Sequence, residues 1–281
     1  MITRILSALV GIPLAVVLVF YPGGLPFAVA IGLISILGAH EFYSGVRKLK
    51  ADPVEPVGLV AVAMFVVSAR TYGPHTIGAI FPAVLTTLLV ISFCVEIVRR
   101  KRAPLVNVGA VLFGAIYVGW LIMHLVVLRG IDGTIVVNGY KAEAGAWLVM
   151  FTFLGTWACD TGAYFVGRFC GKTPMAPHLS PHKTIEGAVG GFVGAVVLSM
   201  IVGWWIIHLP WYHALALGVI FGGLCQLGDL SESAIKREIG IKDFGNVIPG
   251  HGGILDRFDS LLFTGPAMYY YVVLFLGHWI K

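Results

Sequence analysis

Several aspartates in the second half of the chain stand inside or at the edge of apolar stretches. An ionised carboxylate is costly there unless it is paired or coordinates a cation. Asp229 shares one helical face with Gln226, Ser233 and Lys236, because these residues follow one another at i, i+3, i+7 and i+10. A helix that merely emerged into water would leave Asp229 solvated, but it would give no reason for this polar stripe.

A second acidic pair, Asp256 and Asp259, follows a glycine-rich stretch that includes His251, Gly252 and Gly253. The dipole of a helix favours carboxylates at its N-terminus, so helix capping explains one of these aspartates well and two less well. The glycines allow close approach of the backbone to a ligand and can expose amide groups to a phosphate. Both interpretations, a capped helix start and an anion-binding turn, stay open.

The loop at residues 180–184 joins two apolar stretches. Ser180 and Thr184 are candidate caps for the helix that follows, and Lys183 is available to an anionic ligand. The glycines at the start of that helix are expected to let it approach a neighbouring helix closely. These glycines are Gly187, Gly190, Gly191 and Gly194.

Two shorter motifs in this region are weaker. The segment Gly171-Lys172-Thr173 suggests a phosphate-binding P-loop, but the first glycine of that motif is replaced by Val166 and no β-strand precedes it. His178 and His182 have the i, i+4 spacing of a metal pair, but nearby prolines argue against a regular helix there. We therefore reject the P-loop and disfavour a zinc site.

Asp160 lies deep towards the end of an apolar stretch, where the default expectation for an acid is a functional or paired role. With the other aspartates it offers carboxylates for a hard cation, beside basic residues for phosphates. Proteins usually hold Mg²⁺ through carboxylates together with substrate phosphates. Phosphoryl-type transfer needs little beyond positioning and charge neutralisation. The constellation suits a reaction between a membrane lipid and a soluble phosphorylated compound at the cytoplasmic interface.

The scaffold for these residues must lie in a membrane. The chain has 281 residues, of which 58% are hydrophobic and only 12% are charged, whereas a soluble domain carries about 25% charged residues. Its mean hydropathy is +0.91. Because a bilayer core of roughly 30 Å needs about 20 apolar helical residues, the sequence predicts an all-α, polytopic integral membrane protein with about nine transmembrane helices. They are expected at residues 5–22, 25–45, 54–70, 76–97, 105–128, 145–168, 186–207, 211–234 and 259–280.

We expect two regions in this membrane protein. Residues 1–144 hold about five N-terminal spans, and residues 145–281 form the catalytic region, with cytoplasmic loops at 169–185 and 235–258. With a cytoplasmic N-terminus and an outside C-terminus, 15 of the 19 Lys and Arg residues fall on the cytoplasmic side, as the positive-inside rule requires. We expect a bacterial inner (cell) membrane location with the active site facing the cytoplasm.

The stretch from Ser233 to Asp259 resembles the signature of the phosphatidate cytidylyltransferases, also called CDP-diacylglycerol synthases. Every fixed position of that pattern is met with its spacing intact. The segments that begin at Asp160 and at Ser180 also resemble family segments, with His182 where a lysine or arginine is frequent. The clear resemblance covers residues 155–265. The residues that carry the signature are Ser233, Lys236-Arg237, Lys242-Asp243-Phe244-Gly245 and Ile248-Pro249-Gly250-His251-Gly252-Gly253-Ile254-Leu255-Asp256-Arg257-Phe258-Asp259.

The resemblance implies a Mg²⁺-dependent nucleotidyltransferase of phospholipid biosynthesis. Such an enzyme transfers the cytidylyl group of CTP to phosphatidate and yields CDP-diacylglycerol and pyrophosphate. The metal-binding aspartates of the family fall on Asp229 and Asp256, and a monovalent cation such as K⁺ accompanies Mg²⁺ in family members. The resemblance also implies a homodimer within the lipid bilayer, and no nucleic acid is expected as a partner.

Further residue roles follow from the same resemblance. We expect four basic residues to meet phosphates: Lys183, Lys236, Arg237 and Arg257. The expected catalytic residues are Asp229, Asp256, Lys236, Arg237 and Asp259. The residues expected to bind substrate or nucleotide are Lys183, Ser180, Thr184, Arg257, His251, Gly252, Gly253 and Asp160.

Two other functions fit the sequence less well. A CDP-alcohol phosphatidyltransferase would show a D-G-x-x-A-R run with two further spaced aspartates, but Asp132-Gly133 is followed by Thr-Ile-Val. A cation-coupled transporter using Asp160 and Asp229 would place acids near midspan and broken helices in paired positions. Here the polar residues gather at one membrane face instead, which favours an interfacial enzyme.

The charge asymmetry predicts which loops are cytoplasmic. We expect the loops at 99–102 and 172–183 to face the cytoplasm and residues 130–143 to lie outside, because positive residues are retained on the cytoplasmic side. Single cysteines in a background without the four native ones can be labelled with an impermeant reagent in intact cells. A cysteine at position 138 that reacts only after permeabilisation of the cytoplasmic side would contradict this topology.

Overall fold

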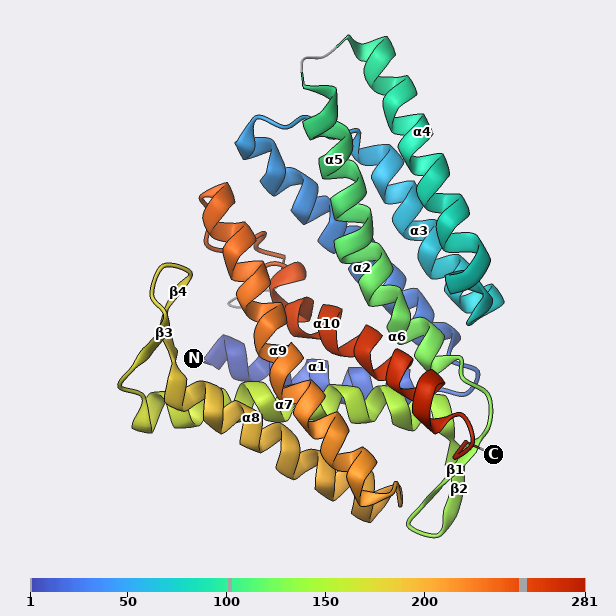
Figure 1. The fold of residues 1–281 in the computed structure, drawn as a ribbon, viewed down its shortest axis with the longest axis vertical. Coiled ribbons are helices and arrows are strands. Elements are labelled where there is room, and N and C mark those ends of the chain that lie inside the picture. The colour runs from blue at the N-terminus through green and yellow to red at the C-terminus, as the bar shows by residue number, and fades with distance from the viewer. Residues whose placement is uncertain (1, 101–102, 248–251, 281) are drawn as a thin grey trace. The chain divides into compact units, whose positions relative to one another are not determined.

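The structure is a computed structural model that describes residues 2–100, 103–247 and 252–280, with side chains described from Leu9 onward. It is built from long helices joined by loops and two short β-hairpins (Figure 1). By its contacts the chain divides into two compact units. The N-terminal unit comprises Met1–Gly130 and Lys236–Phe258, and the C-terminal unit comprises Ile131–Ile235 and Asp259–Lys281.

Proline marks the start of the helices of the N-terminal unit. Pro26, Pro56, Pro82 and Pro104 each stand in the first turn of a helix, where a missing N–H is harmless and a fixed φ suits the helix. The helices after α1 lie side by side (Figure 1). Their bounds are α1 (Ile2–Phe20), α2 (Leu25–Val46) with a 3₁₀ turn (Arg47–Leu49), α3 (Glu55–Tyr72), a π-helical stretch (Thr76–Ile80) leading into α4 (Phe81–Arg99), and α5 (Pro104–Gly114) continued by a π-helical stretch (Ala115–Trp120) into α6 (Leu121–Arg129).

Tyr43 of α2 fills the centre of this unit. Its side chain is fully buried, and its hydroxyl donates to the Val111 carbonyl at 2.9 Å. Gly58 of α3 and Gly114 of α5 lie against its ring, where a Cβ atom would collide with it. Three helices therefore approach closely around one aromatic side chain.

Arg129 at the end of α6 fastens α1 to the unit. Its guanidinium group donates to the carbonyl of Val19 at 2.7 Å and to that of Tyr21 at 2.9 Å. These carbonyls belong to the C-terminal end of α1 and the residue just after it, where helix carbonyls lack partners within the helix and a cation is favourable.

The C-terminal unit begins with a hairpin whose turn residues, Asn138 and Gly139, both have positive φ, the conformation that two-residue hairpin turns prefer. A second hairpin joins the two helices that follow it. The elements are β1 (Thr134–Val137), β2 (Tyr140–Glu143), α7 (Ala144–Cys170), β3 (Pro174–Ala176), β4 (Ser180–Thr184), α8 (Ile185–Ser199) with a π-helical stretch (Met200–Ile206), α9 (Trp211–Ile239), and α10 (Leu255–Tyr271) with a π-helical stretch (Val272–Leu276).

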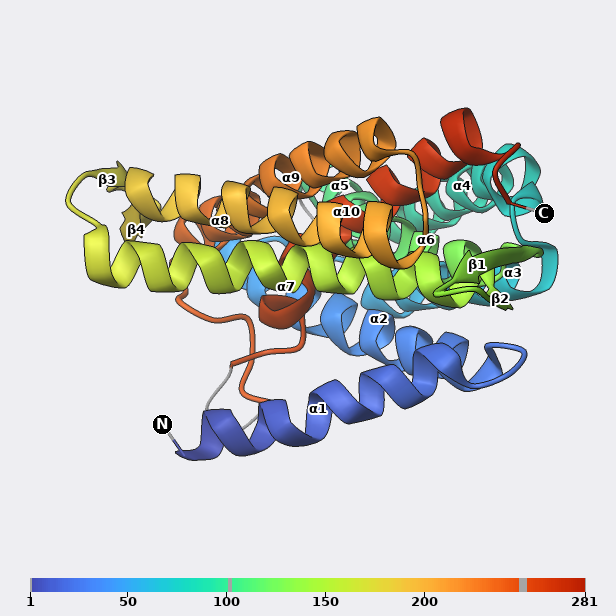
Figure 2. The same ribbon diagram turned by 90° about the horizontal axis from the view of Figure 1, so that it is seen from below.

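Glycines bring α7 and α8 into backbone contact. The two helices run side by side, with the β3–β4 hairpin at one end (Figure 2). A Cβ atom on Gly162 would lie 2.6 Å from the Gly190 carbonyl oxygen, and one on Gly191 would lie 2.7 Å from the Cys159 carbonyl oxygen. The prediction that the glycines of α8 permit close packing is confirmed, and their neighbour is α7.

The predicted spans agree with the helices. Each of the nine predicted spans coincides with a helical segment of the described chain to within a few residues, so the all-α membrane architecture is confirmed. By length and hydropathy, seven segments of the described residues can cross a bilayer; the number of crossings and the orientation of the termini stay predictions. These seven are Leu25–Leu49, Glu55–Tyr72, Thr76–Arg99, Pro104–Arg129, Ile185–Ile206, Trp211–Ile239 and Leu255–Leu276.

The division into units differs from the regions expected on either side of residue 144. The first unit ends at Gly130, and it recruits Lys236–Phe258 from the C-terminal half. This segment packs against α2: Phe244 lies against Gly45 and Leu255 lies near Gly38. Part of the signature is therefore built on an N-terminal helix.

The contact between α7 and α8 predicts the effect of adding one methyl group. Gly162→Ala should lower the free energy of unfolding by about 1–3 kcal/mol, the usual cost of overpacking, because the added carbon meets backbone atoms of α8 that cannot move aside. Thermal unfolding in detergent measures the change. Gly223→Ala in α9 is the matched control, because its added carbon meets nothing within 4 Å; equal losses in both variants would contradict the packing argument.

Candidate functional site

Three carboxylates gather within the C-terminal unit. Asp229 and Glu232 of α9 and Asp259 of α10 each offer an oxygen within 4.8 Å of the other two. Glu232 is only 1% exposed, and the other two are partly buried. Like charges this close repel one another strongly where water is scarce. The arrangement therefore suits a cation, and we call these three residues the acidic cluster.

Gly228 allows the acidic cluster to form. A Cβ atom on Gly228 would lie 2.7 Å from the Asp259 carbonyl oxygen and 3.1 Å from the Ser260 Cα. The Ser260 hydroxyl donates to the Cys225 carbonyl at 3.2 Å, one turn before Asp229. Because the backbones of α9 and α10 approach closely here, carboxylates on the two helices can share one site.

Lys183 neutralises part of the cluster. Its Nζ lies 2.5 Å from Asp229 Oδ2, and the lysine and aspartate side chains are 26% and 35% exposed. Both side chains therefore reach the surface in part, while the Lys183 ammonium nitrogen itself is enclosed beside Asp229. Lys183 is placed by β4, the strand that leads directly into α8.

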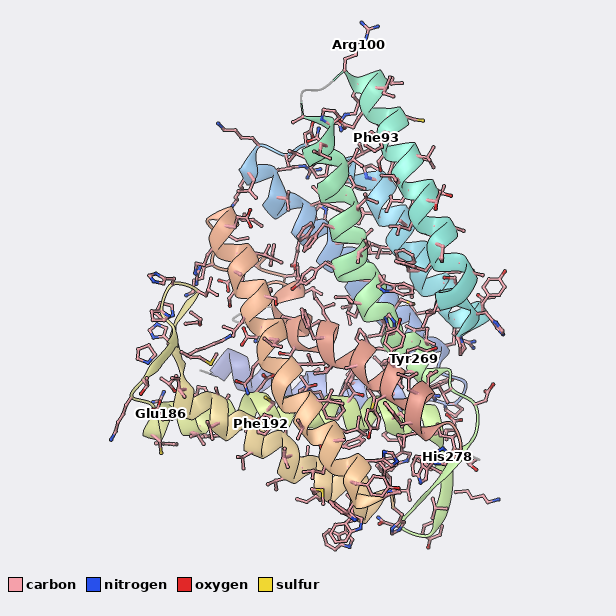
Figure 3. All side chains as sticks on the ribbon, in the orientation of Figure 1. Phe93, Arg100, Glu186, Phe192, Tyr269 and His278 are labelled. Atoms are coloured by element: carbon pink, nitrogen blue, oxygen red, sulfur yellow. The ribbon has the colours of Figure 1, made fainter. Side chains whose placement is uncertain are left out.

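The hairpin that carries Lys183 is held at both ends. The Thr184 hydroxyl accepts a hydrogen bond from Gly187 N at 3.1 Å, so the prediction that Thr184 caps this helix is confirmed. Glu186, at the start of α8 beside the hairpin (Figure 3), accepts from Lys172 N at 3.0 Å and from the Thr173 hydroxyl at 2.8 Å. Ser180, the other predicted cap, lies within β4 instead.

Asp160 and Gln226 hold neighbouring positions on α7 and α9. Asp160 lies on α7 with its side chain exposed on the protein surface, and Cys225 Sγ donates to its Oδ1 at 3.2 Å. Gln226 Nε2 donates at 2.9 Å to the carbonyls of Ala188 and Gly222. The residues of the predicted polar stripe thus have different roles: Gln226 binds α9 to α8, and Asp229 belongs to the acidic cluster.

Asp256 belongs to the N-terminal unit, where its partners are a lysine and backbone amides. Its Oδ1 lies 2.7 Å from Lys236 Nζ, and its Oδ2 accepts from Phe244 N and Gly253 N, both at 2.9 Å. Asp256 lies in the first turn of α10, where the helix dipole favours a carboxylate as expected, but the amide of Gly253 that it accepts from stands before the helix. The ion pair with Lys236 goes beyond capping. The expected convergence of Asp256 with Asp229 stays a prediction.

The remaining predicted residues fall into three groups. Arg237 and Arg257 are exposed, and Arg237 Nη1 donates to the Ile241 carbonyl at 3.0 Å. Gly252 has a φ of 85°, which a residue with a side chain would adopt only with strain. His251 lies outside the described residues.

Glu232 was not among the residues singled out from the sequence. The signal was present, because it follows Asp229 by three residues and such residues share a helical face. The predicted polar stripe runs through Ser233 instead, and in a sequence a buried acid next to such a stripe looks the same as a solvated one. Asp259 was expected to be catalytic without a metal role, and the structure places it beside Asp229.

The comparison with known proteins gives consistent matches. A model of the cytidylyltransferase family matches residues 2–275. A phosphatidate cytidylyltransferase of Synechocystis sp. is 38% identical over 97% of each chain, and one of Bacillus subtilis is 33% identical over 98% of this chain and 97% of its own. A chloroplastic phosphatidate cytidylyltransferase of Arabidopsis thaliana is 32% identical over 94% of this chain and 71% of its own.

Proposed function

The chain belongs to the cytidylyltransferase family, and from this premise we infer that it is a phosphatidate cytidylyltransferase. A phosphate oxygen of phosphatidate forms a bond to the α-phosphorus of CTP. The bond between the α-phosphorus and the bridging oxygen to the β-phosphate breaks, and pyrophosphate leaves with that oxygen. The products are CDP-diacylglycerol, which stays in the bilayer, and pyrophosphate.

The acidic cluster is the observation that carries the mechanistic part of this proposal. Two anionic substrates repel each other, so their reaction needs positive charge at the phosphates. Three carboxylates form a donor set of hard oxygens, which fits Mg²⁺ and does not favour softer metals. We assign Mg²⁺ to Asp229, Glu232 and Asp259. When bound, the ion supplies charge neutralisation for the triphosphate.

The basic residues complete this charge balance. Lys183 lies next to the acidic cluster, so its ammonium group would contact a phosphate of CTP held there with Mg²⁺. Lys236 is held by Asp256 in one direction, which orients its ammonium group for a second phosphate contact. No general base is required, because a phosphate oxygen of phosphatidate is already ionised near neutral pH. Asp256 thereby receives the role of orienting Lys236.

The orientation and assembly of the enzyme are also part of the proposal. Charge asymmetry supports an active site facing the cytoplasm, the compartment that contains CTP, and a location in the bacterial inner membrane. K⁺ as a second cation and a homodimer follow from the resemblance described above. Each remains a proposal for this chain.

The activity is tested with purified protein in detergent, CTP labelled at the α-phosphate, phosphatidate and Mg²⁺. We expect the label to enter the chloroform-soluble fraction, and pyrophosphate to appear in equal amount. Omission of phosphatidate is the control. Label that stays in the aqueous phase, in a folded protein supplied with both substrates, would contradict the proposed function.

The metal assignment predicts different effects for the aspartates. Asp229→Asn and Asp259→Asn should weaken Mn²⁺ binding, measured by electron paramagnetic resonance, and reduce kcat by at least about tenfold, or 1.4 kcal/mol. Asp256→Asn should lower kcat with little change in Mn²⁺ affinity, because its partner is Lys236. Asp132→Asn, in a distant exposed loop, is the control. Mn²⁺ binding lost with Asp256→Asn would instead favour the pair predicted from the sequence.

The position of Lys183 predicts a loss confined to catalysis. Lys183→Ala should reduce kcat/KM by roughly tenfold to a hundredfold, which corresponds to about 1.5–3 kcal/mol for a charge-assisted hydrogen bond. The melting temperature should change little, because the lysine is partly exposed and its hairpin is held by other residues. Lys172→Ala, a lysine at the base of the same loop, serves as the control. Unchanged kinetics would identify Lys183 as an ordinary solvated residue.

A further inference from the structure

Glu41 is an acid in the middle of an apolar helix, with no role in the mechanism described so far. It lies on α2, in the segment Gly38-Ala39-His40-Glu41-Phe42, and it is only 5% exposed. A buried carboxylate costs several kcal/mol unless donors satisfy it. Its donors therefore indicate what the residue holds in place.

The donors of Glu41 are backbone amides of the signature segment. Ile254 N donates to Oε1 at 3.0 Å, and Leu255 N donates to Oε2 at 2.9 Å. These amides stand at the start of α10, which begins at Leu255. The first N–H groups of a helix have no partner within it, and a negative charge is favourable there. Glu41 thus caps α10, although it lies 213 positions before Ile254 in the sequence.

Two glycines of the signature make room for this carboxylate. A Cβ atom on Gly253 would lie 2.6 Å from Glu41 Oε2, and one on Gly245 would collide with Glu41 Oε1. The carboxylate is therefore enclosed by two backbone stretches of the same segment. Neither position could carry a side chain without displacing it.

The same segment holds the ion pair between Asp256 and Lys236. Asp256 accepts hydrogen bonds from Phe244 N and Gly253 N, which adjoin Gly245 and Ile254. The amides of Gly253, Ile254 and Leu255 are thus divided between Asp256 and Glu41. A shift of Glu41 would move the backbone that aims Asp256, and with it the ammonium group of Lys236.

We propose that Glu41 is a positioning residue for cytidylyl transfer: it fixes the backbone at residues 244–245 and 253–255 so that Asp256 can hold Lys236 in its working orientation. The proposal rests on the proposed function and deepens it. It assigns a catalytic consequence to a helix in the N-terminal part of the chain, outside the signature. Glu41 itself contacts no substrate.

The test compares two buried acids of the N-terminal unit. Glu41→Gln keeps the shape of the side chain but turns an NH₂ group towards one of the two amides. Glu96→Gln is the matched control: Glu96 is 3% exposed and is bound by Arg99 and Asn107, away from the signature segment. We expect kcat to fall about tenfold or more, or 1.4 kcal/mol, in Glu41→Gln alone, with Mn²⁺ affinity unchanged. Both variants are expected to lose some thermal stability.

A double-mutant cycle separates positioning from general destabilisation. If Glu41 acts through Lys236, then Glu41→Gln should lower kcat less than about twofold in a Lys236→Ala background, because residues that act as one unit are not additive. A purely structural role would give the same factor in both backgrounds, and this result would overturn the proposal. Wild-type kcat in a folded Glu41→Gln variant would overturn it as well.

Gly245→Ala provides a second route to the same displacement. Its added carbon occupies the position of the Glu41 carboxylate oxygen, so the same loss of kcat and the same non-additivity with Lys236→Ala are expected. This variant decides the question if Glu41→Gln does not fold. Failure of the wild-type enzyme to transfer label from CTP would contradict the proposed function itself, and it is seen before any variant is compared.

Discussion

Carboxylates buried among apolar helices need donors, and the architecture of this protein depends on how that need is met. Glu96 of α4 is bound by Arg99 on its own helix and by Asn107 of α5. Asp256 of α10 is bound by Lys236 of α9 and by amides of the intervening segment. Removal of one partner from such a pair leaves a buried charge uncompensated, at a cost of about 3–5 kcal/mol. Each acid therefore fastens two parts of the chain together.

The acidic cluster differs from these structural acids. Glu41, Glu96 and Asp256 each face donors supplied by the protein. Asp229 and Asp259 face each other and Glu232, and Lys183 is the cation placed beside Asp229. A set of acids that repel one another in this way is suited to an ion and a charged substrate. Within one membrane protein, the arrangement of donors thus distinguishes acids that stabilise the fold from those that we propose to serve the reaction.

The helices and the signature could be predicted from the sequence because their determinants are local. Apolar length identifies the spans, and Pro26 or Pro104 marks a helix start within a residue or two. The Thr184 cap could be predicted for the same reason, because Thr184 and the amide of Gly187 that it accepts from are only three residues apart. Glycine spacing along α8 correctly indicated a close neighbour, although α7 could be identified as that neighbour only from the fold.

The missed features are long-range. The pairing of Glu41 with the amide of Ile254 joins residues 213 positions apart, and no periodicity encodes it. The contact of Asp160 on α7 with the thiol of Cys225 on α9 joins residues 65 positions apart, and it depends on how these helices pack. Glu232 joins the acidic cluster only because Gly228 lets α10 approach α9. In each case a backbone contact between helices decides the role of a side chain.

The distance between Glu41 and its donors also has a consequence for biosynthesis. Chains are made at about 5–20 residues per second, and 213 residues separate Glu41 from the first amide it binds. For roughly 10–40 s after α2 leaves the ribosome, the Glu41 carboxylate must therefore be solvated by water, be protonated or bind the membrane insertion machinery. The helix α2, which anchors the signature segment, is therefore among the first to be inserted, but the hydrogen bonds of its buried acid are among the last to form.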